Sequence, residues 1–241
     1  MKMQQHHAVA YTEVKPDYTM QLRSLLGLLQ DAAVAHSEQA GFGSRRLLDA
    51  GKVWILNKMA VDTQRMPRYQ ETVRVETWHR GSRGFRAYRD FLVFVGSERI
   101  AAATSLWLYF DLCAKRLQRI PQQVGRAYTE EPQEAGCADL DAWKPAAMDG
   151  VGFEVGFITR SSDFDPLGHV NHTVYFDMLE TLVERSLGRQ AALRRLRIHF
   201  QKEIPREVTH VKAGIEDGAN GGRFRIYSER ETFAAGEMEI R

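Results

Sequence analysis

Residues 163–175 read Asp163-Phe164-Asp165-Pro166-Leu167-Gly168-His169-Val170-Asn171-His172-Thr173-Val174-Tyr175. A run rich in β-branched and aromatic residues precedes them near residues 152–159, and it predicts a strand. After them, apolar residues recur at the spacing of one helix face, and Gly188 is the stop signal: Val174, Met178, Leu179, Leu182, Val183 and Leu187. The stretch is therefore predicted to be a loop that leads from a strand into a long helix and holds Asp165 and His169.

The same order of elements is predicted in both halves of the chain. In the first half a strand near residues 8–15 precedes a helix of about 20 residues, with Thr19 as N-cap and Gly41 as stop. A short helix near residues 44–50 follows. Each half then continues with four β-like segments, near residues 53–64, 71–80, 85–95 and 99–111 in the first and 193–204, 207–216, 222–229 and 232–240 in the second.

A local echo supports a duplication. Gln64-Arg65-Met66-Pro67-Arg68 resembles Gln201-Lys202-Glu203-Ile204-Pro205-Arg206; Val73-Arg74-Val75 follows the first segment and Val208-Thr209-His210-Val211 follows the second. We therefore expect an α+β chain of two tandem hotdog repeats, each a curved antiparallel sheet wrapped around a long helix. The expected repeats are residues 1–111 and 151–241, joined by a Pro- and Gly-containing connection over residues 112–150.

The composition is that of an ordinary globular protein. Of 241 residues 44% are hydrophobic and 27% are charged, and the net charge of +2 gives no overall basic field for nucleic acid or an anionic membrane. The two cysteines, Cys113 and Cys137, form no CxxC and no ligand spacing, so we expect neither a disulfide framework nor a structural zinc. The N-terminus lacks an apolar signal region and no run approaches the ~20 apolar residues of a membrane span, so we expect a cytoplasmic protein.

The 163–175 loop contains the groups that thioester hydrolysis needs. Asp165 and His169 supply a carboxylate and an imidazole, and the N–H groups of the first helical turn beyond Val170 are candidate donors to an oxyanion. Asn171 either caps the helix or bonds across the loop. A purely structural interpretation stays open, because Asp, Pro and Gly in this order are also typical of a type I turn.

The loop resembles that of the hotdog thioesterases, approximately D-x-D-x-x-G-H-V-N-N/H-x-x-Y. Three segments of the first half are similar to the acyl-ACP thioesterase family in particular: Leu28 to Ala33, Gly51 to Leu56 and Glu71 to Trp78. The resemblance covers nearly the whole chain. It implies a degenerate first repeat and a catalytic second repeat that hydrolyses fatty acyl thioesters of acyl carrier protein, without a cofactor.

Plant members of this family place an Asn two residues and a His four residues after the aspartate, and a Glu followed by Cys on a later strand. The resemblance assigns Asp165 and His169 to two of these places and Glu203 to a third, with Leu167 and Ile204 replacing the Asn and the Cys. We hypothesise that Asp165 acts on the carbonyl as nucleophile or base with help from His169 and Asn171, while Glu203 activates water. Strand alternation predicts that Glu203 shares a face with Gln201 and His199.

The same resemblance implies that the acyl chain runs between the first helix and its sheet. The expected substrate contacts are Leu25, Leu29, Trp54, Met59 and Trp107, with Gly168 and Val170 in the loop. Two arginine groups are candidate contacts for the acidic carrier, or simply solvated faces: Arg80, Arg83, Arg86 and Arg89, and Arg194, Arg195 and Arg197.

Alternatives remain at this stage. An acyl-CoA thioesterase fits the same arginines, and Leu167 in the place of the family Asn keeps open a non-catalytic acyl-thioester binding module. His169 and His172 are spaced to share a metal, but no further ligand set accompanies them, so no metal is expected. Because two fused repeats already mimic a hotdog dimer, both a monomer and a homodimer are compatible with the sequence.

Overall fold

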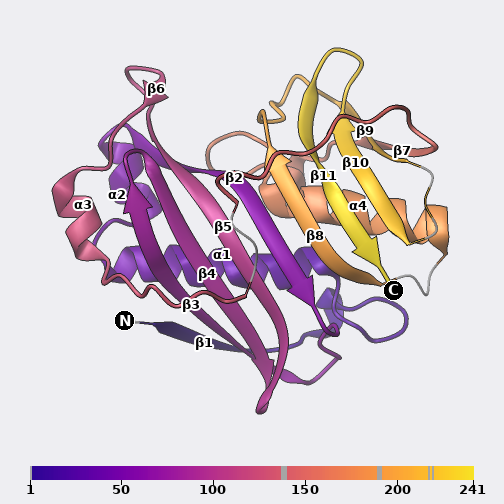
Figure 1. Ribbon diagram of the computed structural model, residues 1–241, viewed down its shortest axis with the longest axis horizontal. Helices are drawn as coiled ribbons and strands as arrows, with labels where there is room; N and C mark the ends of the chain where they lie inside the picture. Colours follow the sequence, from indigo (N-terminus) through magenta and orange to yellow (C-terminus); the bar gives the residue numbers. More distant parts are fainter. Residues whose placement is uncertain (1, 137–139, 189–191, 217, 219) are drawn as a thin grey trace.

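A single antiparallel sheet dominates the computed structural model, which describes residues 2–136, 140–188, 192–216, 218 and 220–241 (Figure 1). Its strands follow the order β1-β3-β4-β5-β2-β8-β11-β10-β9-β7. The two predicted repeats are the two halves of this sheet, each with one long helix. Cys137 lies outside the described residues, and Cys113 is exposed with a free thiol.

The first half differs from expectation mainly at its start. The first strand spans residues 3–8 and shares only Ala8 with the expected range of 8–15. The long helix has Gln21 at its N-cap instead of Thr19, because the Thr19 N–H and hydroxyl both donate to the Asp17 Oδ1. The other predicted elements are present. Their bounds are β1 Met3–Ala8, α1 Leu22–Gln39, α2 Ser44–Asp49, β2 Lys52–Thr63, β3 Thr72–Arg83, β4 Arg86–Val95 and β5 Glu98–Asp111.

The second half repeats this order. A strand, a long helix and four further strands follow one another, and Gly188 ends the helix as predicted. The first of the four strands stops at Phe200, four residues short of the expected end. The bounds are β7 Phe153–Ile158, α4 His172–Leu187, β8 Leu193–Phe200, β9 His210–Ile215, β10 Gly221–Tyr227 and β11 Thr232–Ile240.

The two halves share one hydrophobic core. Strands β2 and β8 pair antiparallel, with Lys58 opposite His199 and Asp62 opposite Arg195, so the sheet continues from one half into the other. Helices α1 and α4 contact each other on the same side of this sheet (Figure 1). Their apolar faces, including Leu25 of α1 and Leu182 of α4, belong to one buried cluster. Burial of this continuous apolar face is the main driving force for the fold.

The connection between the halves covers the opposite side of the sheet. It contains β6 Arg116–Leu117 and α3 Gln122–Ala127 and then crosses the first-half strands (Figure 1). The Trp78 indole donates to the Gln133 carbonyl at 2.8 Å, and Leu140 is fully buried against Trp78 and Leu106. In the described part of the chain, no helix combines the length and the apolar character needed to cross a membrane.

The two loops that lead into the long helices have the same backbone structure. Short 3-10 turns, Tyr11–Glu13 and Ser161–Asp163, open both loops. The Gln21 N–H donates to the Glu13 carbonyl and the Asn171 N–H donates to the Asp163 carbonyl, each at 2.8 Å. Each residue of the second loop therefore has a structural counterpart in the first, which allows the two loops to be compared atom by atom.

Candidate active site

Asp165 opens a tight turn at the entrance to α4. The Gly168 N–H donates to the Asp165 carbonyl and the Leu167 N–H donates to the Asp165 Oδ1, both at 2.9 Å. Gly168 has a φ of 84°, which an L side chain rarely adopts. The turn predicted from the Asp-Pro-Leu-Gly sequence is therefore present, and it fixes the position of the carboxylate that the sequence singled out.

His169 and Glu203 meet beside this turn. The His169 Nε2 lies 3.2 Å from the Glu203 Oε1, with 34% and 62% of the side chains exposed. The expected strand placement of Glu203 is wrong, because β8 ends at Phe200 and Glu203 lies in the following loop. That loop is held against the α4 entrance by a 3.0 Å bond from the Val170 N–H to the Ile204 carbonyl. An exposed pair of this kind contributes little stability, so its position is more informative about chemistry than about folding.

Asn171 is the N-cap of α4. Its Oδ1 accepts hydrogen bonds from the Thr173 N–H at 2.9 Å and the Thr173 hydroxyl at 2.7 Å. Of the two interpretations left open by the sequence, capping is the one that the hydrogen bonds support. Asn171 thereby fixes where the helix starts.

Few of the N–H groups at the start of α4 remain available. Thr173 and Val174 donate to Asn171, and Val170 donates to Ile204. Within the described residues, the His172 N–H has no acceptor. The expected set of helix donors is therefore reduced to this group, which stands at the positive end of the helix dipole.

The first loop shows what such an N–H group binds. The Leu22 N–H, the counterpart of the His172 N–H, donates to the Glu180 Oε2 of the other helix at 2.9 Å. Lys15 is the counterpart of Asp165, and its Nζ lies 3.1 Å from the Glu180 Oε1. Burial raises the pKa of the Glu180 carboxyl, and the Lys15 ammonium opposes that shift. A carboxylate oxygen thus already occupies the helix-start donor in the first repeat, while the same donor in the second repeat is open.

The His172 ring has a structural environment. It lies between Trp107 and Phe200, with ring centroids at 6.3 and 6.0 Å. Burial lowers its pKa to about 4, so the ring is neutral at pH 7. His169 faces Glu203 instead, and among the described residues no three His, Cys, Asp or Glu side chains are grouped to hold a metal ion.

Tyr175 and Asp163 are site residues that the sequence reasoning did not assign. Tyr175 is 2% exposed, and its ring packs edge-on against Phe200 at 5.3 Å. Burial raises its pKa, and the nearby Glu203 and Asp165 carboxylates add to the shift. Asp163 is 2% exposed and pairs with Arg160 at 3.0 Å. Both belong to the 163–175 stretch, but the residue type alone did not distinguish a buried support from a reacting group.

Most of the expected substrate contacts fall in the shared core. Leu25, Leu29, Met59 and Val170 are buried there, and Trp107 packs against the same cluster. Trp54 lies apart from that cluster. Its ring packs on Tyr109 at 4.9 Å.

The arginine groups are largely neutralised or buried. Arg89 is only 7% exposed, so both interpretations offered for its group, a contact with the carrier and a solvated face, are wrong for this residue. Other members pair with carboxylates: Arg80 with Glu134, Arg86 with Asp141, Arg195 with Asp62 and Arg197 with Glu237. Arg206 belongs to neither group. Its guanidinium lies over the ring of Phe164, 5.1 Å from the ring centroid, and Phe164 directly precedes Asp165 in the sequence.

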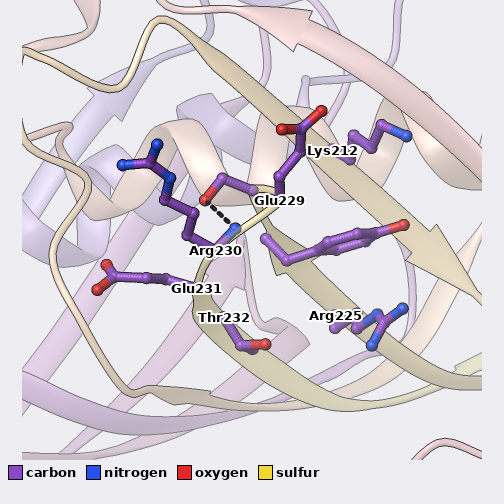
Figure 2. Close-up of a pocket in the computed structure, with 8 residues that line it drawn as sticks. Lys212, Arg225, Glu229, Arg230, Glu231 and Thr232 are labelled. Atoms are coloured by element: carbon purple, nitrogen blue, oxygen red, sulfur yellow. Dashed lines mark hydrogen bonds between the residues drawn. The ribbon is translucent and has the colours of Figure 1, made fainter.

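A pocket of about 460 Å³ lies at the turn between β10 and β11 (Figure 2). Lys212, Arg225 and Arg230 line it together with Glu229 and Glu231, so its charge is mixed. The pocket contains none of the expected catalytic residues. The Lys202–Glu231 ion pair, at 2.8 Å, joins its rim to the loop that carries Glu203.

Comparisons with known proteins agree along most of the chain. A family model described as acyl-ACP thioesterase N-terminal domain matches residues 1–128, and one described as acyl-ACP thioesterase C-terminal domain matches residues 148–231. A chloroplastic acyl-[acyl-carrier-protein] hydrolase of Cuphea viscosissima is 24% identical over 238 residues, covering 94% of this chain. The chain spans 58% of the length of that relative.

Solved structures support the same fold. The 12:0-ACP thioesterase from Umbellularia californica superposes with a TM-score of 0.85 at 21% identity, covering 100% of this chain and 97% of that one. An acyl-ACP thioesterase from Bacteroides thetaiotaomicron gives a TM-score of 0.86 at 18% identity, covering 100% and 98%. With both halves matched by family models and the two-hotdog fold matched over its full length, the chain belongs to the acyl-ACP thioesterase family.

Proposed function

We propose that this protein hydrolyses the thioester between a fatty acyl chain and acyl carrier protein, releasing the free fatty acid. The observation that carries the proposal is the α4 entrance, where His169 pairs with Glu203 and the Asp165 N–H donates to the His169 carbonyl at 2.9 Å, directly before the helix that starts at His172. These groups match the three requirements of the reaction: a base, a group acting at the carbonyl and a donor to the developing oxyanion. The family membership supports the choice of carrier.

The oxyanion donor is proposed by analogy within the molecule. In the first repeat the Leu22 N–H binds the Glu180 carboxylate oxygen, which has the charge and the size of a thioester oxyanion. The His172 N–H has the same place in the second repeat, at a helix N-terminus that favours negative charge. A thioester carbonyl oxygen placed there is polarised toward attack.

The Glu203–His169 pair is proposed to activate water. As the water oxygen bonds to the carbonyl carbon, its proton passes to this pair, and the oxyanion collapses with loss of the C–S bond. The departing thiolate then takes up the proton. Asp165 is proposed to act at the carbonyl carbon, either by orienting the water or by attacking first to form an acyl anhydride that water hydrolyses.

Single turnover in ¹⁸O-labelled water separates these two roles for Asp165. Direct attack by water puts the label only into the released fatty acid. Water that opens an anhydride at the Asp165 carboxyl carbon puts the label into that side chain, where mass spectrometry of the digested protein detects it. Label in the Asp165 side chain contradicts direct attack by water as the only route, because direct attack never labels the protein.

The function itself is tested by measuring fatty acid release from a panel of acyl-ACPs of increasing chain length, with the matched acyl-CoAs beside them. We expect a higher kcat/KM for the ACP series. Higher values for the CoA series contradict the carrier assignment and favour an acyl-CoA thioesterase. Binding of acyl-ACP without any cleavage contradicts catalysis and favours a binding module, in which Leu167 replaces an amide that the reaction needs.

A further inference from the structure

A second polar cluster lies between α1 and the sheet of the first repeat. It comprises His36 of α1, His79 of β3, Arg89 of β4 and Tyr128, which follows α3. Their exposed fractions are 8%, 5%, 7% and 7%, so the cluster is almost closed to solvent. We call these four residues the Arg89 cluster.

Arg89 is a buried cation with neutral partners. Its Nη1 donates to the His36 Nδ1 at 2.9 Å and to the Thr77 hydroxyl at 3.1 Å. Within the described part of the chain, no carboxylate forms an ion pair with it. Burial lowers the pKa of Arg89 to about 10, so the guanidinium is still charged at pH 7. A buried charge without a counter-charge is costly, and an anion placed beside it recovers that free energy.

The cluster also contains an unsatisfied polar atom. The His79 Nε2 is buried and has no hydrogen-bond partner. Its ring lies 5.4 Å from the Tyr128 ring, which in turn meets His36 at 5.7 Å. Buried polar atoms are nearly always bonded, so an open nitrogen beside an unpaired guanidinium points to a missing ligand group.

A chain of contacts links the Arg89 cluster to the α4 entrance. The Trp107 ring meets His172, its indole donates to the Ser105 hydroxyl at 2.8 Å, and that hydroxyl donates to the Arg89 carbonyl at 3.2 Å. Arg89 pairs with Ser105 across β4 and β5. Ser105 and Trp107 are two residues apart on β5, and such residues are separated by about 7 Å along a strand. The Arg89 cluster therefore lies about 7 Å from Trp107 along the strand direction.

We propose that the Arg89 cluster binds a carboxylate group, and that this carboxylate is the far end of an acyl chain whose thioester lies at the α4 entrance. The choice of ligand source rests on the proposed function. A carboxylate pairs with the guanidinium, and its negative charge favours the protonated His79 ring, which donates from Nδ1 to the Tyr88 carbonyl and from Nε2 to the ligand. A methyl terminus does neither, so the cluster favours a dicarboxylic acyl chain over an ordinary fatty acyl chain of the same length.

Binding is tested without catalysis. Melting temperatures are measured with dicarboxylic acids of increasing length, each beside the monocarboxylic acid of equal carbon number, and with acetate. We expect a dicarboxylic acid of one preferred length to raise the melting temperature more than its partner. Equal shifts within every pair overturn the proposal. Equal stabilisation by acetate overturns the part that assigns the acyl chain as the source.

Two variants show whether the cluster is responsible. In Arg89→Met and in His79→Phe the advantage of the dicarboxylic acid should disappear, whereas the exposed Arg99→Met on β5 should keep it. Arg89→Met removes an unpaired buried charge, so we expect it to fold with unchanged or higher stability. If Arg89→Met does not fold, His79→Phe alone decides. Retention of the advantage in a folded His79→Phe or Arg89→Met protein overturns the assignment.

Kinetics test the link to the reaction. We expect kcat/KM for a carboxyl-ended acyl-ACP to exceed that for its methyl-ended partner about tenfold or more, and Arg89→Met to reverse this order. Cleavage of neither substrate means that the proposed function has failed, and the melting experiment still decides the carboxylate site. Cleavage with a preference for methyl ends in the wild type overturns the carboxylate site and leaves the proposed function intact.

Discussion

Single residues at the α4 entrance differ in what holds them. Asp165 is fixed by a turn, Asn171 by its capping bonds to Thr173, and the exposed Glu203 side chain by its contact with His169. Replacing a residue that supports the fold should lower the free energy of unfolding. Replacing a residue that takes part in the reaction should lower kcat.

We expect Asp165→Asn to lower kcat by about 100-fold or more, the lower end of acid–base contributions. The amide keeps the turn, because its Oδ1 accepts the Leu167 N–H bond that the carboxylate accepts now. Fatty acid release under saturating acyl-ACP measures the effect, with the melting temperature as a control for folding. Turnover within a few-fold of the wild type contradicts the role of Asp165.

The Glu203–His169 pair is expected to act as one unit. Glu203→Gln and His169→Gln should each lower kcat strongly, and the double variant should cost about as much as the larger single change. Glu231→Gln, which breaks the neighbouring exposed pair with Lys202, is the matched control and should leave kcat unchanged. Additive losses in the double variant would show that the two side chains work independently.

At the scale of elements, the two loop-and-helix units have the same backbone but different contents. The first holds Lys15 and the Glu180 carboxylate where the second holds Asp165 and an open N–H. The position of the open His172 N–H depends on where α4 starts, because a shift of the first helical turn would move this N–H group. The cap is therefore the link between the structure of this helix and the reaction.

We expect Asn171→Ala to lower the free energy of unfolding by about 1 kcal/mol, the usual value of an N-cap side chain. Asn171→Ser restores a capping oxygen and should recover both stability and most of the activity. Urea unfolding and fatty acid release are measured on both variants. If the Ser variant is stable yet as inactive as Asp165→Asn, Asn171 acts on the substrate as well as on the helix.

At the scale of the whole molecule, stability should fall in acid because of the buried His36 and His79 and the partly buried His172. Burial lowers the pKa of His36, His79 and His172 from 6.5 to about 4, and Arg89 adds to the shift of the first two. The unfolded chain therefore binds more protons than the folded one between pH 6.5 and 4. This stability is complete above pH 6.5 and is lost as the pH falls toward 4.

The expected slope is at most roughly 1.4 kcal/mol per pH unit for each histidine. Urea unfolding at a series of pH values measures it, with His79→Gln as the comparison. The variant should lose part of the slope between pH 6.5 and 4 while keeping the rest. A wild-type stability that stays constant across this interval contradicts the assignment of neutral, buried rings.

The sequence by itself determined the order of the elements and the two-repeat fold. The spacing of apolar residues and the turn-forming residues predict the elements, because they reflect local backbone preference and the burial of one face. The apolar face of α4, which ends at Gly188, is an example. The sequence also determined the family, since Asp165, His169 and the residues between them form one local motif. The first strand was misplaced because its alternation was weak and pairing with β3 selected residues 3–8.

Only the tertiary structure decided which side chains meet. Glu203 reaches His169 because the loop after β8 folds against the α4 entrance, a contact between residues far apart in the chain. Arg89 looked like one member of a basic surface group, yet strand alternation within a covered sheet turned it inward beside His36. Sequence spacing fixes local geometry, whereas burial and charge pairing depend on long-range packing that no local pattern encodes.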